Sequence, residues 1–346
     1  MDRTGLAVLT ALLTLSLGCS SYTIRRADSA AEAGDYATAR ELYHRAATDG
    51  MNGYARLQLA KIYEEGLDGE PNPAEALRWY RASADLGNGY AQFKAGQLLE
   101  QGSGSPPDDR TAAAYYESAA RQGEALAALR LAEMALDGRG VEQDTSRARS
   151  LFESAARQGN AQAAYRLGVV LLQPGAPEAQ LKGGFDWLLV AAHQGHALAQ
   201  TSLAHALRNG EGVAVDEKLA KVWFREAADR GNIAAQHELA NLDEAEGDME
   251  QANQWRLAAA KSGYIPAQIA IAEACQDTGA DPSCAAHWYN EAAKGGNAYA
   301  QYQMGLLSES GEGVPRDLGQ ARKWYGMAAE GEMLAARQRL RALGGS

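Results

Sequence analysis

The sequence predicts an all-α protein in which pairs of helices stack into a solenoid. Three observations support this fold class. A phrase ending in Gly recurs about every 36 residues along most of the 346-residue chain. The composition is 46% hydrophobic but holds only 4 Phe beside 37 Gly, which suits small residues that let helices pack closely. The chain is also longer than a single core usually grows, and a repeat array solves that problem.

The net charge limits the partners of this chain. At a formal −11, the protein is poorly suited to nucleic acid, whose affinity comes mainly from Lys and Arg that neutralise phosphates. The same sign repels anionic polysaccharides and lipid head groups. We therefore expect no nucleic-acid partner and no direct binding to anionic polymers, so that a role near such polymers would run through partner proteins.

The first 18 residues have the features of a signal peptide. An apolar run from Leu6 to Leu17 follows Arg3, and it is shorter than the roughly 20 residues that a membrane-spanning helix needs. The phrase around Cys19 resembles the bacterial lipobox, in which the Cys is lipidated and becomes the mature N-terminus. The sequence thus predicts a lipoprotein signal peptide at 1–18.

On this interpretation, residues 19–26 are a lipidated N-terminus and a short linker, and the acyl chains on Cys19 anchor the protein to a membrane. Ser20, in place of Asp, resembles the sorting pattern of outer-membrane lipoproteins. We therefore expect an outer-membrane lipoprotein of the bacterial cell envelope that faces the periplasm. Ordinary signal-peptidase cleavage, which would leave a soluble protein, is the alternative.

The repeat is defined by its closing glycine. The phrase Ala-Ala-x-x-Gly, with two looser relatives near the N-terminus, gives glycine spacings of 37, 36, 36, 36, 36, 32 and 33 residues. A Gly can end a helix because it readily adopts the left-handed conformation. These structural glycines are Gly50, Gly87, Gly123, Gly159, Gly195, Gly231, Gly263 and Gly296.

Each period divides into two helices. The first follows an Asn/Ala-Gln phrase such as Asn160–Ala163, and the second ends at the Ala-Ala pair. Between them lies a Gly-x-Gly-Val turn at 138–141, 210–213 and 311–314, and an Asp follows it at a constant distance. These Asp residues are expected to cap the second helix. They are Asp144, Asp216 and Asp317.

These motifs resemble the Sel1-like repeat, a relative of the tetratricopeptide repeat. The resemblance covers 27–331, as about nine helix pairs, and implies a right-handed superhelical α/α solenoid. It also implies that other proteins bind the concave surface, which the first helix of each pair mainly forms. The segment 332–346, in which Arg337, Arg339 and Arg341 alternate with apolar residues, is expected to be a C-terminal capping helix.

No catalytic residue, metal ligand or cofactor site emerges, and we expect a protein that is not an enzyme. The Gly-rich turns lack the order of a phosphate-binding loop, and His237-Glu238 is not followed by the second His of a zinc motif. One aromatic slot recurs eight residues before the closing Gly position, and Tyr or Leu also occupies it, so its Trp side chains are expected to pack in the core. They are Trp79, Trp187, Trp223, Trp255, Trp288 and Trp324.

Cys275 and Cys284 bracket a loop that contains Gly and Pro. In an oxidising periplasm such a pair is expected to form a disulfide. A redox or metal role is the alternative, but neither a CxxC motif nor a neighbouring His supports it.

The leading hypothesis is an outer-membrane-anchored periplasmic scaffold that mediates protein–protein interactions in an envelope or secretion assembly. The repeats resemble those of alginate-export lipoproteins, which implies a role in exopolysaccharide secretion. One alternative is a secreted envelope enzyme or cell-wall binder of the β-lactamase-like Sel1 type, although Ser-x-x-Lys and Gly-x-Ser-x-Gly motifs are absent. A flagellar or signalling adaptor is the other alternative.

Overall fold

The computed structural model describes residues 21–49, 52–279 and 281–344. Over these ranges the chain is all helical and contains no strand. Among the described helices, none combines the length and the apolar character needed to span a bilayer. The lipidation predicted at Cys19 and the turn predicted at Gly50 lie outside the described residues.

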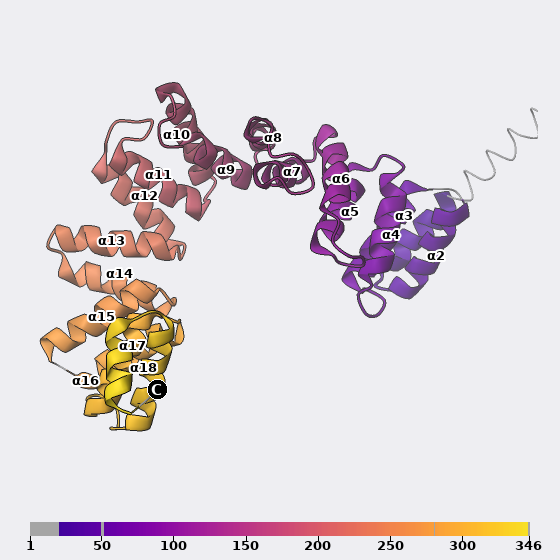
Figure 1. Ribbon diagram of the computed structural model, residues 1–346. Coiled ribbons are helices and arrows are strands. Elements are labelled where there is room, and N and C mark those ends of the chain that lie inside the picture. The colour runs from indigo at the N-terminus through magenta and orange to yellow at the C-terminus, as the bar shows by residue number, and fades with distance from the viewer. Residues whose placement is uncertain (1–20, 50–51, 280, 345–346) are drawn as a thin grey trace, which may run out of the picture. The chain divides into compact units, whose positions relative to one another are not determined.

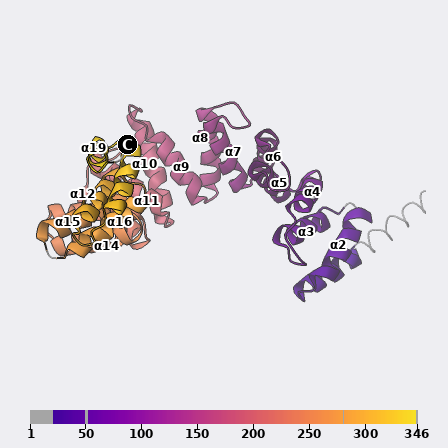
Figure 2. The ribbon, with the colours of Figure 1, turned by 60° about the horizontal axis from the view of Figure 1, so that its bottom comes forward.

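The helices form two compact units, which divide in the sequence between Val170 and Leu171 (Figures 1 and 2). Residues 21–32 form the first described helix, so the segment 21–26, expected to be a linker, is helical. The helices that follow it in unit 1 are α2 (Tyr36–Asp49), α3 (Gly53–Glu65), α4 (Pro73–Ala84), α5 (Gly89–Gln101), α6 (Asp109–Arg121), α7 (Ala125–Asp137), α8 (Thr145–Arg157) and α9 (Ala161–Leu171), whose last residue reaches the division. Those of unit 2 are α10 (Glu178–His193), α11 (Ala197–Asn209), α12 (Glu217–Asp229), α13 (Ile233–Ala245), α14 (Met249–Lys261), α15 (Ile265–Thr278), α16 (Pro282–Lys294), α17 (Ala298–Ser310), α18 (Leu318–Glu330) and α19 (Leu334–Ala342).

From α2 to α8 and from α10 to α19, consecutive helices pack side by side, and an odd-numbered first helix with the even-numbered second helix after it forms one repeat. Polar caps set where the second helices begin. The Asp144 carboxylate accepts a hydrogen bond from the Arg147 amide at the start of α8, and Asp216 and Asp317 cap α12 and α18 in the same way. Each cap satisfies an amide that has no partner within its own helix.

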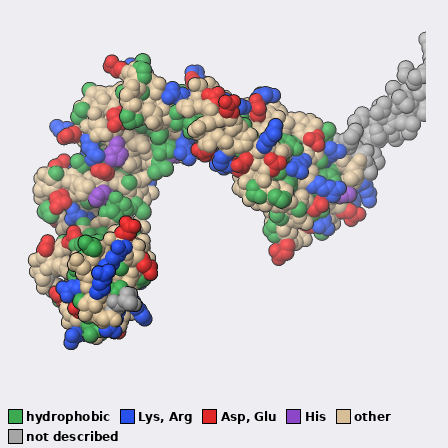
Figure 3. All heavy atoms as spheres, viewed as in Figure 1, with side chains coloured by type: hydrophobic (Ala, Val, Ile, Leu, Met, Phe, Trp, Pro, Cys, Tyr) green, Lys and Arg blue, Asp and Glu red, His purple; other side chains and the backbone are tan. Residues whose placement is uncertain are grey.

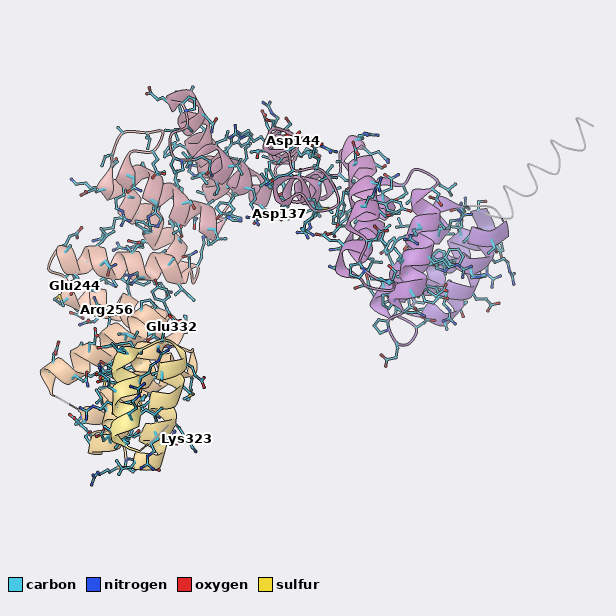
Figure 4. The ribbon with its side chains drawn as sticks, viewed as in Figure 1. Asp137, Asp144, Glu244, Arg256, Lys323 and Glu332 are labelled. Carbon is cyan, nitrogen blue, oxygen red and sulfur yellow. A yellow bond between two sulfur atoms is a disulfide. The ribbon has the colours of Figure 1, made fainter. Side chains whose placement is uncertain are left out.

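Every closing glycine in the described residues has a positive φ, from Gly87 to Gly296. The next closing position falls at Glu332, which has a φ of 64° and is the one non-glycine residue with positive φ in the described part of the chain. Figure 4 shows Glu332 beside the C-terminal helices. A side chain in this conformation costs about 1–2 kcal/mol, so the last turn before α19 is strained.

The Gly-x-Gly-Val turns pack closely against the second helix of the previous repeat. A Cβ on Gly140 would lie 2.2 Å from the carbonyl oxygen of Asp109 at the start of α6, and one on Gly212 would lie 2.3 Å from that of Leu181 in α10. Only glycine permits so close an approach of two backbones. The second glycine of the turn therefore sets the spacing between neighbouring second helices.

The Ala-Gln phrase joins repeats by a buried hydrogen bond. The Gln200 Nε2 in α11 donates to the carbonyl oxygen of Ala192 at the end of α10, at 3.2 Å, and Gln236 does the same to Ala228. Each Gln thus adds a second hydrogen bond to a carbonyl at the C-terminus of the preceding helix, which already accepts one from the amide of the closing glycine. This explains why the phrase recurs next to the closing glycine.

Candidate protein-binding surface

The first helices of unit 1 present a regular stripe of side chains. Three positions of each helix, spaced as i, i+4 and i+7, lie on one face and are partly or fully exposed. We call this set the first-helix stripe. It consists of Tyr54, Gln58 and Lys61 in α3, Tyr90, Lys94 and Gln97 in α5, Leu126, Arg130 and Glu133 in α7, and Gln162, Arg166 and Val169 in α9.

Ion pairs run along this stripe from one repeat to the next. The Arg130 guanidinium lies 2.8 Å from a carboxylate oxygen of Glu100 in the preceding repeat and 2.7 Å from one of Glu133. Glu133 in turn pairs with Arg166 at 3.1 Å. The carboxylate side chains of Glu100 and Glu133 are only 7% and 15% exposed, so these pairs hold the longer Arg side chains in fixed positions.

Burial and hydrogen bonding act in opposite directions on Glu100. Burial alone would raise its pKa, but hydrogen bonds from the Tyr116 hydroxyl, Arg139 and Arg130 outweigh this and hold the pKa of the carboxyl below its ordinary value. Glu100 is therefore a stable anionic centre between repeats. Its role is to order the stripe, because every contact it makes is to a neighbouring repeat or helix.

The first stripe position of α3, α5 and α7 holds an exposed aromatic or apolar side chain. Tyr54, Tyr90 and Leu126 are 46%, 39% and 50% exposed, and the ammonium of Lys61 lies 5.4 Å from the ring centre of Tyr90. Tyr and Arg are the residue types enriched where proteins bind each other. The stripe therefore offers a preorganised surface for a protein partner.

Unit 2 presents a similar but less regular face. Leu198 is 51% exposed in α11, and Tyr299 in α17 donates a hydrogen bond to Glu273 at 3.1 Å. Glu238, which follows His237, accepts from Arg208 at 2.7 Å and so has a structural partner. Both signs of charge and small apolar patches are interspersed on the viewed face of the molecule (Figure 3).

The Trp side chains of the predicted slot lie at the edge of the core. Trp79 and Trp324 are buried at 5% and 9% exposure, whereas Trp187, Trp223, Trp255 and Trp288 are half-buried. The fully buried side chain is the next residue along, a position that the sequence analysis did not single out, although Trp-Tyr and Trp-Phe pairs signal it. This buried slot holds Tyr80, Tyr116, Phe152, Leu188, Phe224, Tyr289 and Tyr325.

The residue type in the buried slot depends on the residue sixteen positions earlier in a full repeat, at the end of the first helix. Tyr116 donates to Glu100 at 2.8 Å and Tyr325 to Glu309 at 2.7 Å, whereas Phe152, which has no hydroxyl, has Leu136 at the matching position. A buried hydroxyl needs a partner and a buried ring without one does not. In these three repeats the two positions therefore change together.

The remaining predicted residues lie apart from the stripe. Cys275 and Cys284 are joined by a disulfide that ties the end of α15 to the start of α16. His196 caps α11 by accepting a hydrogen bond from the Ala199 amide, and the His193 ring packs against Trp223 at 5.2 Å. Within the described ranges, no group of three or more His, Cys, Asp or Glu side chains is arranged to hold a metal ion.

Comparison with known proteins identifies the repeat. The family model described as Sel1 repeat matches most of the chain, in segments that pass from 232 directly to 266. The matched segments are 29–51, 53–88, 89–124, 125–160, 161–196, 197–232, 266–297 and 298–332. The chain belongs to the Sel1 repeat family. Sel1 repeat arrays are suited to protein–protein interaction and are generally not enzymes.

Two solved Sel1 structures resemble the whole array. A Sel1 repeat protein from Oxalobacter formigenes is 28% identical with a TM-score of 0.70, and the alignment covers 86% of this chain and 88% of that one. The c5321 protein, a protective antigen present in uropathogenic Escherichia coli strains, is 30% identical with a TM-score of 0.57 over 89% of this chain and 75% of its own.

A curated relative is similar over a short segment only. The chitin synthase regulator SKT5 of Malassezia restricta is 45% identical over 58 residues, which are 17% of this chain and 4% of that protein. The chain therefore spans a small part of the length of this relative.

Proposed function

We propose that this Sel1 protein is a scaffold of the bacterial cell envelope that brings together the protein components of an envelope or secretion assembly. The observation that carries the proposal is the first-helix stripe, in which Tyr54, Tyr90 and Arg130 stand at fixed positions on rigid helices. Rigid aromatic and Arg side chains lower the entropy cost of binding. The surface offers area for a partner chain rather than a catalytic pocket.

The place of action follows from the N-terminal sequence. We propose that Cys19 is lipidated and anchors the chain to the outer membrane, facing the periplasm. The Cys275–Cys284 disulfide supports an oxidising compartment, because such bonds are rare where thiols are kept reduced. Among envelope assemblies we favour exopolysaccharide export, on the resemblance of the repeats to alginate-export scaffolds, and expect the contact to be with its proteins and not with the polymer.

A photo-cross-linking amino acid placed at Tyr90 in the cell tests the scaffold role. The matched control places it at Ser150, an exposed position on second helix α8. We expect discrete cross-linked envelope proteins from the Tyr90 position and few from Ser150. If both positions yield the same products, the stripe is not the binding surface, and if no outer-membrane or secretion component is recovered, the export assignment fails.

Lipid anchoring has a separate test. Mass spectrometry of the mature protein should show an acylated Cys19, and a Cys19→Ala variant should move from the membrane fraction to the soluble periplasm. An unmodified N-terminus elsewhere in the chain would contradict the anchor but would leave the scaffold role standing.

A further inference from the structure

The repeat formed by α13 and α14 is shorter than its neighbours, and this opens a groove beside α12. Three residues, Glu246 to Asp248, join α13 to α14, whereas seven residues join α11 to α12. The seven-residue turn rests on the preceding second helix through Gly212, but Gly247 has no atom within 4 Å of a Cβ built on it. The turn before α12 covers part of the preceding second helix, α10, but the short turn before α14 does not cover the start of α12 in the same way.

The uncovered space is a groove of about 560 Å³ along α12 and the end of α13. Its apolar residues are Val222, which is 55% exposed, and Leu242. Carboxylates also line it, and the side-chain carboxylates of Glu217, Glu226 and Asp229 have no hydrogen bond or ion pair within the described residues. The groove thus combines an apolar wall with anionic groups that have no partner.

Lys221, which lines this groove, is paired with the buried carboxylate of Asp243. The Lys221 ammonium lies 2.6 Å from an oxygen of Asp243 and 2.6 Å from one of Glu246. Burial alone would lower the pKa of Lys221, but the two carboxylates outweigh this and hold it above its ordinary value. The Asp243 side chain is 2% exposed, and its second oxygen has no hydrogen-bond partner.

Asp243 occupies a core position. Leu99, Leu171 and Leu207 stand at the same place in three other repeats. A buried charge in an apolar slot costs stability, and such departures from local rules concentrate at functional sites. Four carboxylates and three cations line the groove, and Asp243, which pairs with the lining residue Lys221, adds a fifth carboxylate, so the charge favours a cationic occupant.

We propose that this groove is a docking site for a turn of a partner protein that carries a Lys or Arg beside an apolar residue. The turn takes the place of the missing loop on α12. Its apolar side chain packs on Val222 and Leu242, and its cation lies among Glu217, Glu226 and Glu246. The site lies on second helix α12 of unit 2 and shares no residue with the first-helix stripe of unit 1. It rests on the proposed function only in that both require a protein partner.

The experiment uses a phage-displayed library of disulfide-closed heptapeptides selected against the full chain. Counter-selection uses a variant in which the seven residues Gly210–Asp216 are copied in place of Glu246–Asp248, so that a full-length turn covers the groove. Val222→Lys is a second variant that adds a cation to the apolar wall. The matched control is Ser150→Lys, the same change at the equivalent position of α8.

We expect the enriched peptides to carry Lys or Arg next to an apolar residue. Their affinity should fall at least tenfold in the turn-graft and Val222→Lys variants and stay unchanged in Ser150→Lys, while circular dichroism shows that all the variants remain folded. Acidic peptides, peptides that the turn-graft variant binds equally well, or no discriminating peptide would overturn the proposal. So would a dimer of the chain that the graft abolishes, because a second copy would then occupy the groove. None of these outcomes depends on cross-linking at Tyr90, so the two proposals fail separately.

Discussion

Removal of Lys221 should destabilise unit 2 far more than removal of a surface lysine. The variant Lys221→Ala leaves the Asp243 carboxylate, 2% exposed, without its cation. Breaking a buried pair in this way costs about 3–5 kcal/mol, because the remaining charge is neither solvated nor paired. Glu246 adds little, since its side chain is 61% exposed and surface pairs contribute at most about 1 kcal/mol.

Replacing both partners should restore the stability. Leu fills the Asp243 position in three other repeats, and Ala fills the Lys221 position at Ala113 and Ala286. The free energy of unfolding of the double variant Lys221→Ala/Asp243→Leu should therefore lie within about 1 kcal/mol of the parent value or above it, because apolar replacement of a buried pair is often neutral or stabilising.

Urea unfolding followed by circular dichroism measures both effects. Lys294→Ala is the control, because its partner Glu291 lies on the surface and both side chains are at least 39% exposed. We expect a change below about 0.5 kcal/mol for this control. A free energy of unfolding of Lys221→Ala within about 1 kcal/mol of the parent value would contradict this prediction. A double variant as unstable as Lys221→Ala would contradict it too.

Three further predictions concern backbone strain and pH. Gly140→Ala should destabilise more than Gly159→Ala, because both have positive φ but only Gly140 would place its Cβ against a backbone carbonyl; equal losses in thermal unfolding would contradict this. Glu332→Gly should stabilise by about 0.5–1 kcal/mol, the relief of positive-φ strain less the greater freedom of the unfolded chain, and a lower melting temperature would count against it. The folded protein holds the pKa of Glu100 below its ordinary value, so this carboxylate stabilises the fold above its unfolded pKa, and the stabilisation is lost as the pH falls through its folded pKa. Tyr116→Phe removes a hydrogen bond and raises the folded pKa of Glu100, so the midpoint of acid unfolding should move to higher pH. An unchanged midpoint would assign the effect to the arginines alone.

The features of the fold that repeat locally could be predicted from the sequence. The closing glycines, the aspartate caps and the Ala-Gln phrase each depend on residues a few positions away in the chain, so spacing alone indicates them. The membership in the Sel1 family follows from the same phrases. The choice between Trp and the next residue as the fully buried side chain could not be made this way, because both recur with the same period and only packing separates them.

The candidate sites were harder to predict because they depend on contacts between repeats. The ion pairs that join one repeat to the next along the first-helix stripe connect residues 30 or more positions apart, as in Arg130 with Glu100, and no phrase marks them. Asp243 could have been found by aligning the repeats with one another and asking which slot exchanges Leu for a charge. A buried carboxylate that replaces Leu belongs to no sequence motif of catalysis or metal binding.

The short repeat shows how a deletion is accommodated in an array. Arg256 occupies the slot where other repeats bury Tyr or Phe, and it pairs with Glu244 at 2.6 Å, twelve residues earlier instead of sixteen (Figure 4). The pair thus keeps the link between the end of α13 and the middle of α14 after the loss of four residues, with an ion pair in place of the Tyr–Glu hydrogen bond. Each repeat is stabilised mainly by its neighbours, so an array can hold one repeat whose core is partly charged. That tolerance leaves the α13–α14 repeat free to carry binding chemistry that a regular repeat would exclude.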